Sequence, residues 1–174
     1  MSQFQSLLSD IDQLFKAYQS RRPLTDDAKI AHFEKLRLEW TYHSNAIEGN
    51  SLTLGETAFY LREGLTSEGK PLIDYLEVKN HTEAIDWLFA IVKQVRPITA
   101  GFIKDLNALL HKGITARPAK GADGQIIMRQ ITPGVYKTQA NHVLTLTGQI
   151  HYYVEPLQVA EEMEKLITLI KTSA

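Results

Sequence analysis

Ser44 and Glu48 stand four residues apart, a spacing that places both side chains on one face of a helix. Gly49 follows directly and is a natural stop for that helix, because glycine adopts the left-handed conformation without a steric penalty. Glu48 therefore falls in the last turn, where the helix macrodipole disfavours a negative charge. A carboxylate there needs a cation or a hydrogen-bond donor. On spacing alone, the alternative is a solvated glutamate near a helix end.

The composition argues against several other kinds of site. The chain has no cysteine, and its six histidines are scattered without a His-Glu-x-x-His pattern, so we expect no metal site. No Walker-type phosphate loop occurs in the sequence. The net charge is -1 and no helix is markedly basic, which argues against a helical DNA-binding module and against nucleic acid as a partner.

The hydrophobic pattern also bears on the compartment. No apolar stretch approaches the roughly 20 residues needed to span a bilayer. The N-terminus has no basic region followed by an apolar run, so it does not read as a signal peptide. We therefore expect no membrane partner and a cytoplasmic location, which the lack of cysteine fits.

Helical periodicity dominates the sequence, with apolar residues recurring at steps of three and four. The expected helices cover about residues 2–20, 25–49, 53–63, 74–91, 99–111 and 156–170. In the second, an inward stripe is expected at Ile30, Phe33, Leu36, Trp40 and Ile47. Ser2 with Gln5 could cap the first helix, and Thr53 with Glu56 the third.

The pattern changes after His111. Residues 113–141 are rich in glycine and proline and carry no helical stripe, so we expect a structureless stretch with a functional role. Alternation follows, with Thr147-Gly148 between its two halves, and predicts a β-hairpin. One face would carry Leu144, Leu146, Ile150, Tyr152 and Val154, and the other Val143, Thr145, Gln149, His151 and Tyr153.

The segment 44–57 resembles the inhibitory helix of the Fic (Fic/DOC) family. Ser44 to Gly49 matches the pattern Ser/Thr-x-x-x-Glu-Gly/Asn, and the likeness continues through Asn50 to Thr57. Weaker family patterns follow in order over residues 30–170: they are Asn80-His81, the run ending at His111, 133–137 with Lys137 in place of the usual Arg, and 151–163. The chain is thus similar to the N-terminal part of a Fic-family AMP-transferase.

The resemblance implies both a reaction and a residue that inhibits it. Fic proteins transfer AMP from ATP, with Mg²⁺, to a hydroxyl of a target protein, using a loop of pattern His-Pro-Phe-x-x-Gly-Asn-Gly-Arg-x-x-Arg. No histidine here begins such a loop, so we expect no catalytic residue in this chain and leave its own enzyme activity open. Glu48 would pair with the second Arg of that loop, which otherwise binds the ATP γ-phosphate. Ser44 would set the helix against the nucleotide site, Gly49 would end it, and Asn50 would brace its end.

The resemblance also implies a docking element for the protein substrate. The late hairpin would be the family's flap, which pairs with an extended segment of the target. Its docking residues would be Val143, Leu144, Thr145, Leu146 and His151. The alternative is a structural hairpin that only covers the core.

These expectations combine into one prediction of fold and function. The fold is mainly α, a Fic-like core of about six helices with one late β-hairpin. The domains are an N-terminal helix (1–24), an inhibitory helical region (25–50) and the N-terminal part of a Fic core (51–174) with the flap near 133–154. The function is the regulatory and target-docking part of an adenylyltransferase autoinhibited by Glu48. The alternative is a non-catalytic regulatory domain that inhibits a partner Fic protein or forms a homodimer through its first helix.

Overall fold

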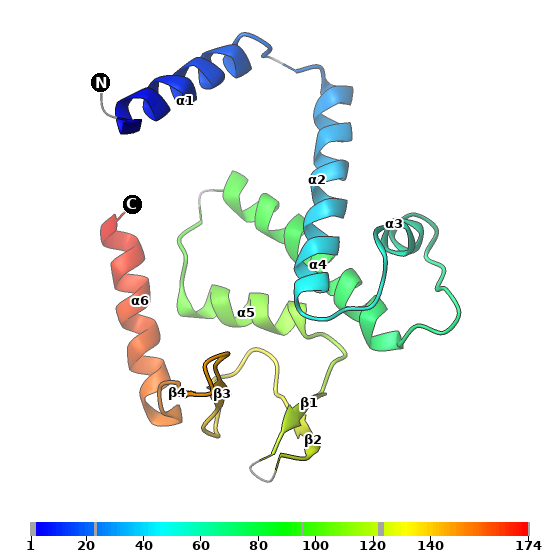
Figure 1. Ribbon diagram of the computed structural model, residues 1–174, viewed down its shortest axis with the longest axis vertical. Helices are drawn as coiled ribbons and strands as arrows, with labels where there is room; N and C mark the ends of the chain where they lie inside the picture. The colour runs from blue at the N-terminus through cyan, green and yellow to red at the C-terminus, as the bar shows by residue number, and fades with distance from the viewer. Residues whose placement is uncertain (1–2, 23, 95, 122–123, 174) are drawn as a thin grey trace. The chain divides into compact units, whose positions relative to one another are not determined.

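The computed structural model describes residues 3–22, 24–94, 96–121 and 124–173, so Ser2 of the expected first cap lies outside the described residues. The chain divides into two compact units, Met1–Glu39 and Trp40–Ala174, with the boundary inside a helix. The elements, labelled in Figure 1, are α1 (Gln3–Gln19), α2 (Asp26–Ile47), α3 (Leu54–Glu63), α4 (Leu72–Lys93), α5 (Ala100–Leu110), β1 (Ala116–Lys120), β2 (Ile126–Gln130), β3 (His142–Leu144), β4 (Ile150–Tyr152), a 3₁₀ turn (Pro156–Gln158) and α6 (Val159–Ser173).

The first unit holds α1 and the beginning of α2. The Thr25 hydroxyl accepts a hydrogen bond from the Ala28 amide at 3.2 Å, and Asp26 and Asp27 place negative charge in the first turn of α2, where the macrodipole favours it. The predicted apolar stripe of α1 is present but lies in solvent. Its large exposed side chains are Leu7, Leu8, Ile11, Leu14, Phe15 and Tyr18.

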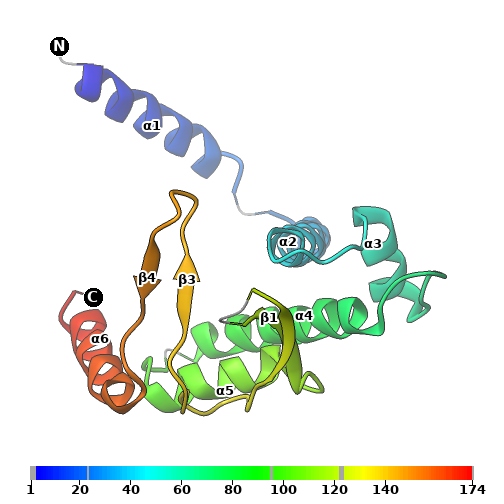
Figure 2. The ribbon, with the colours of Figure 1, turned by 60° about the horizontal axis from the view of Figure 1, so that its bottom comes forward.

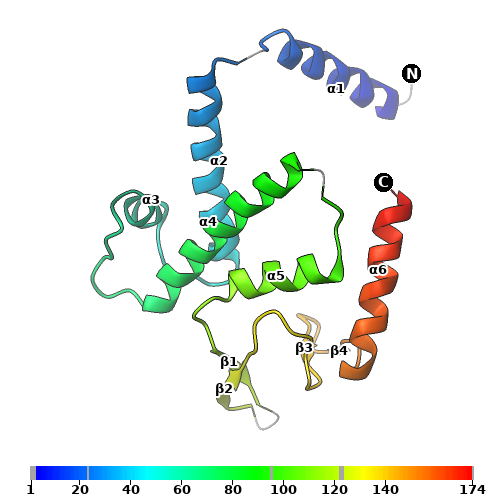
Figure 3. The same cartoon turned by 180° about the vertical axis from the view of Figure 1, so that it is seen from behind.

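The core of the second unit is built on α4. Tyr75, Val78 and Ile85 of α4 are each at most 2% exposed. Helix α3 packs on α4, where the rings of Tyr60 and Tyr75 meet edge to face with centroids 5.0 Å apart. Helix α5 packs on α4 as well and α6 packs on α5, as the views from both sides show (Figures 1 and 3). The six predicted helices are confirmed.

A buried amide ties α4 to the chain beyond α5. Asn80 is 2% exposed, and its Nδ2 donates to the carbonyl oxygens of Leu110 at 3.2 Å and Lys112 at 2.8 Å. These carbonyls lie at the end of a helix, where no intrahelical donor remains for them. Asn80 therefore fixes the start of the segment that leads into β1.

The predicted inward stripe of α2 is wrong: Ile30 is 61% exposed and Leu36 is 41% exposed, and Phe33 is half-buried. Ile47 is 83% exposed and Trp40 is 42% exposed, whereas Thr41 is fully buried and Asn45 is 9% exposed. The Thr41 hydroxyl lies 3.3 Å from that of Thr82 on α4, and Asn45 Nδ2 donates to the Thr41 carbonyl at 2.8 Å. A polar contact with α4 decides which face of the C-terminal end of α2 is buried. The periodicity of apolar residues does not reveal such a contact.

Residues 113–141 are not structureless as predicted, because they contain β1 and β2. These strands pair antiparallel in the register Ala116↔Gln130 to Lys120↔Ile126. Ile126, Ile127 and Met128 are all exposed, so β2 has no buried face. A strand without a buried face shows no alternation of apolar and polar residues, which is why the sequence gives no signal for it.

The late hairpin is confirmed. Strands β3 and β4 pair in the register His142↔Tyr152, Val143↔His151 and Leu144↔Ile150 (Figure 2), which keeps the two predicted faces apart. Thr145 and Gln149 close a three-residue loop in which Gly148 takes φ 79°. A type I turn followed by a left-handed residue is a common hairpin loop. Both strands are exposed along their whole length.

The capping box of α3 is present as predicted and offers a test of the local fold. The Thr53 hydroxyl accepts from the Glu56 amide at 3.2 Å, and the Glu56 carboxylate accepts from the Thr53 amide at 2.8 Å. We predict that Thr53→Ala lowers the free energy of unfolding by about 1 kcal/mol, measured by urea denaturation. Thr66→Ala, in the exposed loop after α3, is the control, and equal stability of the two variants would contradict the assignment.

Candidate functional site

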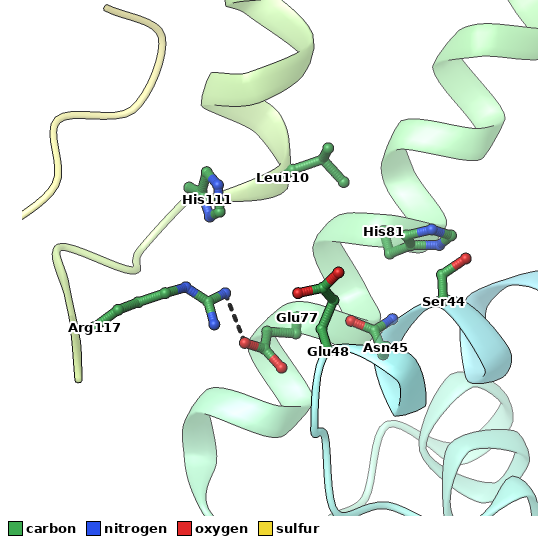
Figure 4. A pocket seen from close by; sticks show the side chains of 8 residues that line it. All are labelled: Ser44, Asn45, Glu48, Glu77, His81, Leu110, His111 and Arg117. Atoms are coloured by element: carbon green, nitrogen blue, oxygen red, sulfur yellow. Dashed lines mark ion pairs between the residues drawn. The ribbon is translucent and has the colours of Figure 1, made fainter. Parts of the chain in front are cut away.

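Ser44 and Glu48 line one cavity of about 460 Å³ within the second unit. The cavity is bounded by the end of α2, the middle of α4, the end of α5 and the start of β1 (Figure 4). Its lining residues are Ser44, Asn45, Glu48, Glu77, His81, Leu110, His111 and Arg117. The segment that carries Ser44 and Glu48 therefore opens onto a space shared with residues distant in sequence. We call this space the Glu48 cavity.

The end of α2 is held against α4 by Asn50. Its Nδ2 donates to the Asp74 carbonyl and to Glu77 Oε2, both at 2.9 Å, while its Oδ1 accepts from the Leu52 amide at 3.1 Å. The Asn50 amide donates to the Asn45 carbonyl at 3.0 Å, which closes the helix end. We call this set of contacts the Asn50 clamp.

The residue after Asn50 adds a second attachment to α4. The Ser51 amide and hydroxyl donate to Asp74 Oδ2 at 2.8 and 2.6 Å, and Asp74 is only 7% exposed. Hydrogen bonds to a carboxylate are among the stronger ones in proteins. The backbone that follows Glu48 and Gly49 is therefore fixed at successive residues.

Glu48 itself is held only through its backbone. Its amide donates to the Asn45 carbonyl at 3.1 Å, and Gly49 then turns the chain with φ 92°. The Glu48 side chain is exposed, and among the described residues its carboxylate has no cationic partner and no hydrogen-bond donor. Ser44 and Glu48 both point into the Glu48 cavity (Figure 4). The structure thus brings the two residues together as predicted, with the carboxylate unpaired.

Glu77 and Arg117 were missed by sequence reasoning. Arg117 Nη2 lies 2.7 Å from Glu77 Oε1, and the Glu77 side chain is only 10% exposed. Glu77 belongs to the first two turns of α4 and Arg117 to β1, and neither lies in a recognisable motif. Since Glu77 accepts from both Arg117 and Asn50, the single arginine of the Glu48 cavity is already paired.

Two histidines of the cavity are kept neutral by their surroundings. Burial lowers the pKa of His81, whose Nδ1 lies 3.2 Å from the Thr41 hydroxyl. Burial and the neighbouring Arg117 charge lower the pKa of His111, against the opposite influence of Glu77. Because the folded state binds fewer protons than the unfolded chain, the contribution of both groups to stability is present above about pH 6.5 and is lost as the pH falls below it.

The five predicted docking residues gather on the β3–β4 hairpin, and none of them lines the Glu48 cavity. Val143 is 44% exposed, Leu144 is 62% exposed, and Leu146 lies fully in solvent at the tip. The Thr145 hydroxyl accepts from the Gln149 amide at 3.1 Å, so it supports the turn. His151 is exposed opposite Val143.

Neither a metal cluster nor a membrane-spanning helix is found in the part of the chain that the structure describes. No group of three or more His, Cys, Asp or Glu side chains there is placed to hold a metal ion. None of the helices described there is long and apolar enough to cross a bilayer.

The chain is similar to proteins named as Fic adenylyltransferases. It is 32% identical to "Protein adenylyltransferase Fic" of Nematostella vectensis over 97 residues, which are 55% of this chain and 22% of that protein. It is 29% identical to the protein of that name from Drosophila persimilis over 130 residues, 75% of this chain and 24% of that protein. The chain therefore spans less than a quarter of the length of these relatives. No family model matches it.

Solved structures agree with this similarity. A Fic domain containing signaling protein from Bacteroides thetaiotaomicron superimposes with a TM-score of 0.79 at 31% identity, covering 93% of this chain and 56% of that one. A Fic family protein from Desulfovibrio desulfuricans shares the fold, with a TM-score of 0.62 at 15% identity over 98% of this chain and 46% of that one. The six helices and the late hairpin form a Fic-like helical fold. The curated relatives and the 31% identical structure together support a Fic-family protein.

The electrostatics of the Glu48 cavity can be tested through His111. We predict that Arg117→Met raises the pKa of His111, because it removes a nearby positive charge and releases the Glu77 carboxylate, which favours the protonated ring. The measurement is an NMR titration of the His111 ring protons. Arg96→Met, which lines neither cavity, is the control. An unchanged or lowered pKa in Arg117→Met would show that the Arg117 charge does not act on this ring.

Proposed function

We propose that this chain is the regulatory and target-docking part of a Fic-family protein adenylyltransferase, and that Glu48 is its inhibitory residue. The observation that carries the proposal is the Glu48 carboxylate, which projects into the Glu48 cavity without a cationic partner among the described residues. A residue that captures a cation from elsewhere needs a fixed backbone and an unpaired carboxylate that faces the cavity.

The charge of Glu48 explains why a partner is expected. A carboxylate in the last turn of a helix faces the negative end of the macrodipole, which costs roughly 0.3–1 kcal/mol at an exposed site. Arg117 is the arginine of the cavity lining, but it is bound to Glu77. We therefore assign the partner to the second Arg of the Fic catalytic loop. A bidentate Arg–carboxylate pair is strong and directional, so it would withdraw that Arg from the ATP γ-phosphate.

The charges of the Glu48 cavity support an assignment of ATP binding and catalysis to residues outside it. ATP is the expected AMP donor, and binding of its phosphates requires cations or backbone donors. The cavity offers two carboxylates, Glu48 and Glu77, against one arginine that is already paired. We therefore assign the phosphate contacts, Mg²⁺ and the transfer chemistry to the catalytic loop, and we assign no catalytic role to residues of this chain.

The β3–β4 hairpin supports the docking role. It is a two-stranded sheet, so each strand presents an unpaired backbone edge among the described residues. The exposed Val143 and Leu144 add apolar surface next to that edge. An extended target segment added to such an edge is held by backbone hydrogen bonds, and this fixes its register largely without regard to its sequence. The hairpin would thereby present the target hydroxyl for AMP transfer.

Helix α1 supports a second role in self-association. Six large apolar side chains of one helix face, from Leu7 to Tyr18, are between 46% and 71% exposed. An exposed apolar stripe of this extent on a helix is typical of a surface that pairs with another helix. A second copy of α1 offers the matching stripe, so we propose a homodimer formed through this helix.

The inhibitory role predicts a gain of activity. In the full-length protein, we expect Glu48→Gln and Glu48→Gly each to increase AMP incorporation by at least about tenfold, because loss of one charged pair of about 1.4 kcal/mol changes an equilibrium tenfold. The measurement is transfer of labelled AMP from ATP onto the protein itself. Glu68→Gln, an exposed glutamate outside the cavity, should behave as wild type. Equal labelling of wild type and both Glu48 variants would refute the inhibitory role of Glu48.

The dimer proposal predicts the effect of one charge on α1. We expect the wild-type chain to be dimeric and Leu14→Asp to be monomeric in sedimentation equilibrium, because a buried unpaired carboxylate at the interface is strongly unfavourable. Gln13→Asp, on the polar face of the same helix, should remain dimeric. A monomeric wild type would exclude this role for α1.

A further inference from the structure

A second cavity, of about 520 Å³, lies beside the β1–β2 hairpin in the second unit. It is bounded by the end of α5, the paired strands β1 and β2, and the segment that leads from β2 to β3. The lining residues used below are Asn107, His111, Arg117, Arg129, Lys137 and Asn141, and none of its lining residues is an aspartate or a glutamate. We call it the basic cavity.

The basic cavity brings two like charges directly together. Arg117 and Arg129 are cross-strand partners in the β1–β2 register, and both line the cavity. Like charges directly opposite each other on two strands are destabilising. Arg117 is compensated by Glu77, which lies outside this lining.

The other two cations have only neutral partners. Arg129 Nη2 donates to the Ala140 carbonyl at 2.9 Å and to Gln139 Oε1 at 3.3 Å. Lys137 Nζ donates to Asn141 Oδ1 at 2.5 Å, and it faces the Tyr153 ring at 5.9 Å. Neither cation has a carboxylate partner among the described residues, so the cavity keeps an uncompensated positive charge.

Two buried polar atoms border the same space. Arg117 Nε and His111 Nδ1 have no hydrogen-bond partner among the described residues. Both residues line the basic cavity, although they also border the Glu48 cavity. A buried donor without a partner costs about 1–3 kcal/mol, and a bound acceptor in the cavity would remove part of that cost.

The basic cavity is continuous with the docking hairpin. Asn141 lines the cavity and is followed directly by His142, the first residue of β3. Strand β3 lies on the side of the β1–β2 hairpin, whereas β4 lies on the side of α6 (Figures 2 and 3). A peptide strand added to the free edge of β3 would therefore leave the hairpin over the segment that forms the cavity wall.

We propose that the basic cavity binds an acidic side chain, Asp or Glu, of the target segment that pairs with β3. The proposal rests on the proposed docking role of the hairpin and adds a preference for sequence to it. Arg129 and Lys137 are the residues that read the charge, because their present partners are neutral groups that a carboxylate can replace. The backbone pairing would position the segment, and the acidic side chain would select among segments.

The test uses two fluorescein-labelled peptides that differ only in charge. Both carry an alternating Thr-Val stretch, followed by Glu residues in one and by Gln residues in the other. Binding to the 174-residue protein is measured by fluorescence anisotropy. We expect the Glu peptide to bind roughly three- to tenfold more tightly than the Gln peptide at about 50 mM NaCl, and this preference to shrink at about 300 mM NaCl.

The variants assign the effect to the cavity. Arg129→Gln with Lys137→Gln should abolish the preference for the Glu peptide while leaving the affinity for the Gln peptide unchanged, which also shows that the variant is folded. Lys93→Gln, an exposed lysine of α4 that lines neither cavity, should keep the full preference. Equal binding of both peptides to the wild type would overturn the proposal and leave the docking hairpin in place. Binding of neither peptide would overturn both. A preference that persists in the double variant would place the acidic site elsewhere.

Discussion

The side-chain amide of Asn50 is the contact on which the Glu48 site depends. It bridges the Asp74 carbonyl and the Glu77 carboxylate, and thereby attaches the end of α2 to the first two turns of α4. Helix ends fray unless their terminal groups find partners. The Asn50 clamp supplies such a partner for the Asn45 carbonyl, six residues after Ser44 and directly after the turn at Gly49. The backbone around Glu48 is therefore fixed by neighbouring residues, while its carboxylate has no cationic partner or hydrogen-bond donor among the described residues.

The two glutamates of the cavity illustrate two uses of the same chemical group. Glu77 is nearly buried and fully occupied, since it accepts from Asn50 and pairs with Arg117. Removing a partner from such a group is costly, which makes it a structural element. Glu48 is exposed and has no partner among the described residues. Because Arg117 Nη2 is already paired with Glu77, the arrangement supports the proposal that Glu48 meets a cation from outside the cavity.

Sequence reasoning succeeded where one local rule decided the outcome. The helices followed from apolar periodicity, the α3 cap from Thr53 and Glu56, and the late hairpin from alternation around Gly148. The placement of Ser44 and Glu48 on one helix face followed from their spacing. Sequence reasoning failed where contacts between distant polar groups decided the outcome. Thr41, rather than Ile47, became the buried residue of α2 because it meets Thr82. The β1–β2 hairpin has no buried face and so no pattern. Glu77 and Arg117 meet only in the folded chain, forty residues apart in sequence.

The central claim is that the Asn50 clamp aims Glu48 at its inhibitory target, and a double-mutant cycle on AMP transfer tests it most directly. The full-length protein would carry Asn50→Ala, Glu48→Gln or both. The account predicts that Asn50→Ala alone raises transfer although Glu48 is intact, and that it adds little in the Glu48→Gln background. Transfer at the wild-type level in Asn50→Ala, or independent and additive effects of the two substitutions, would contradict it.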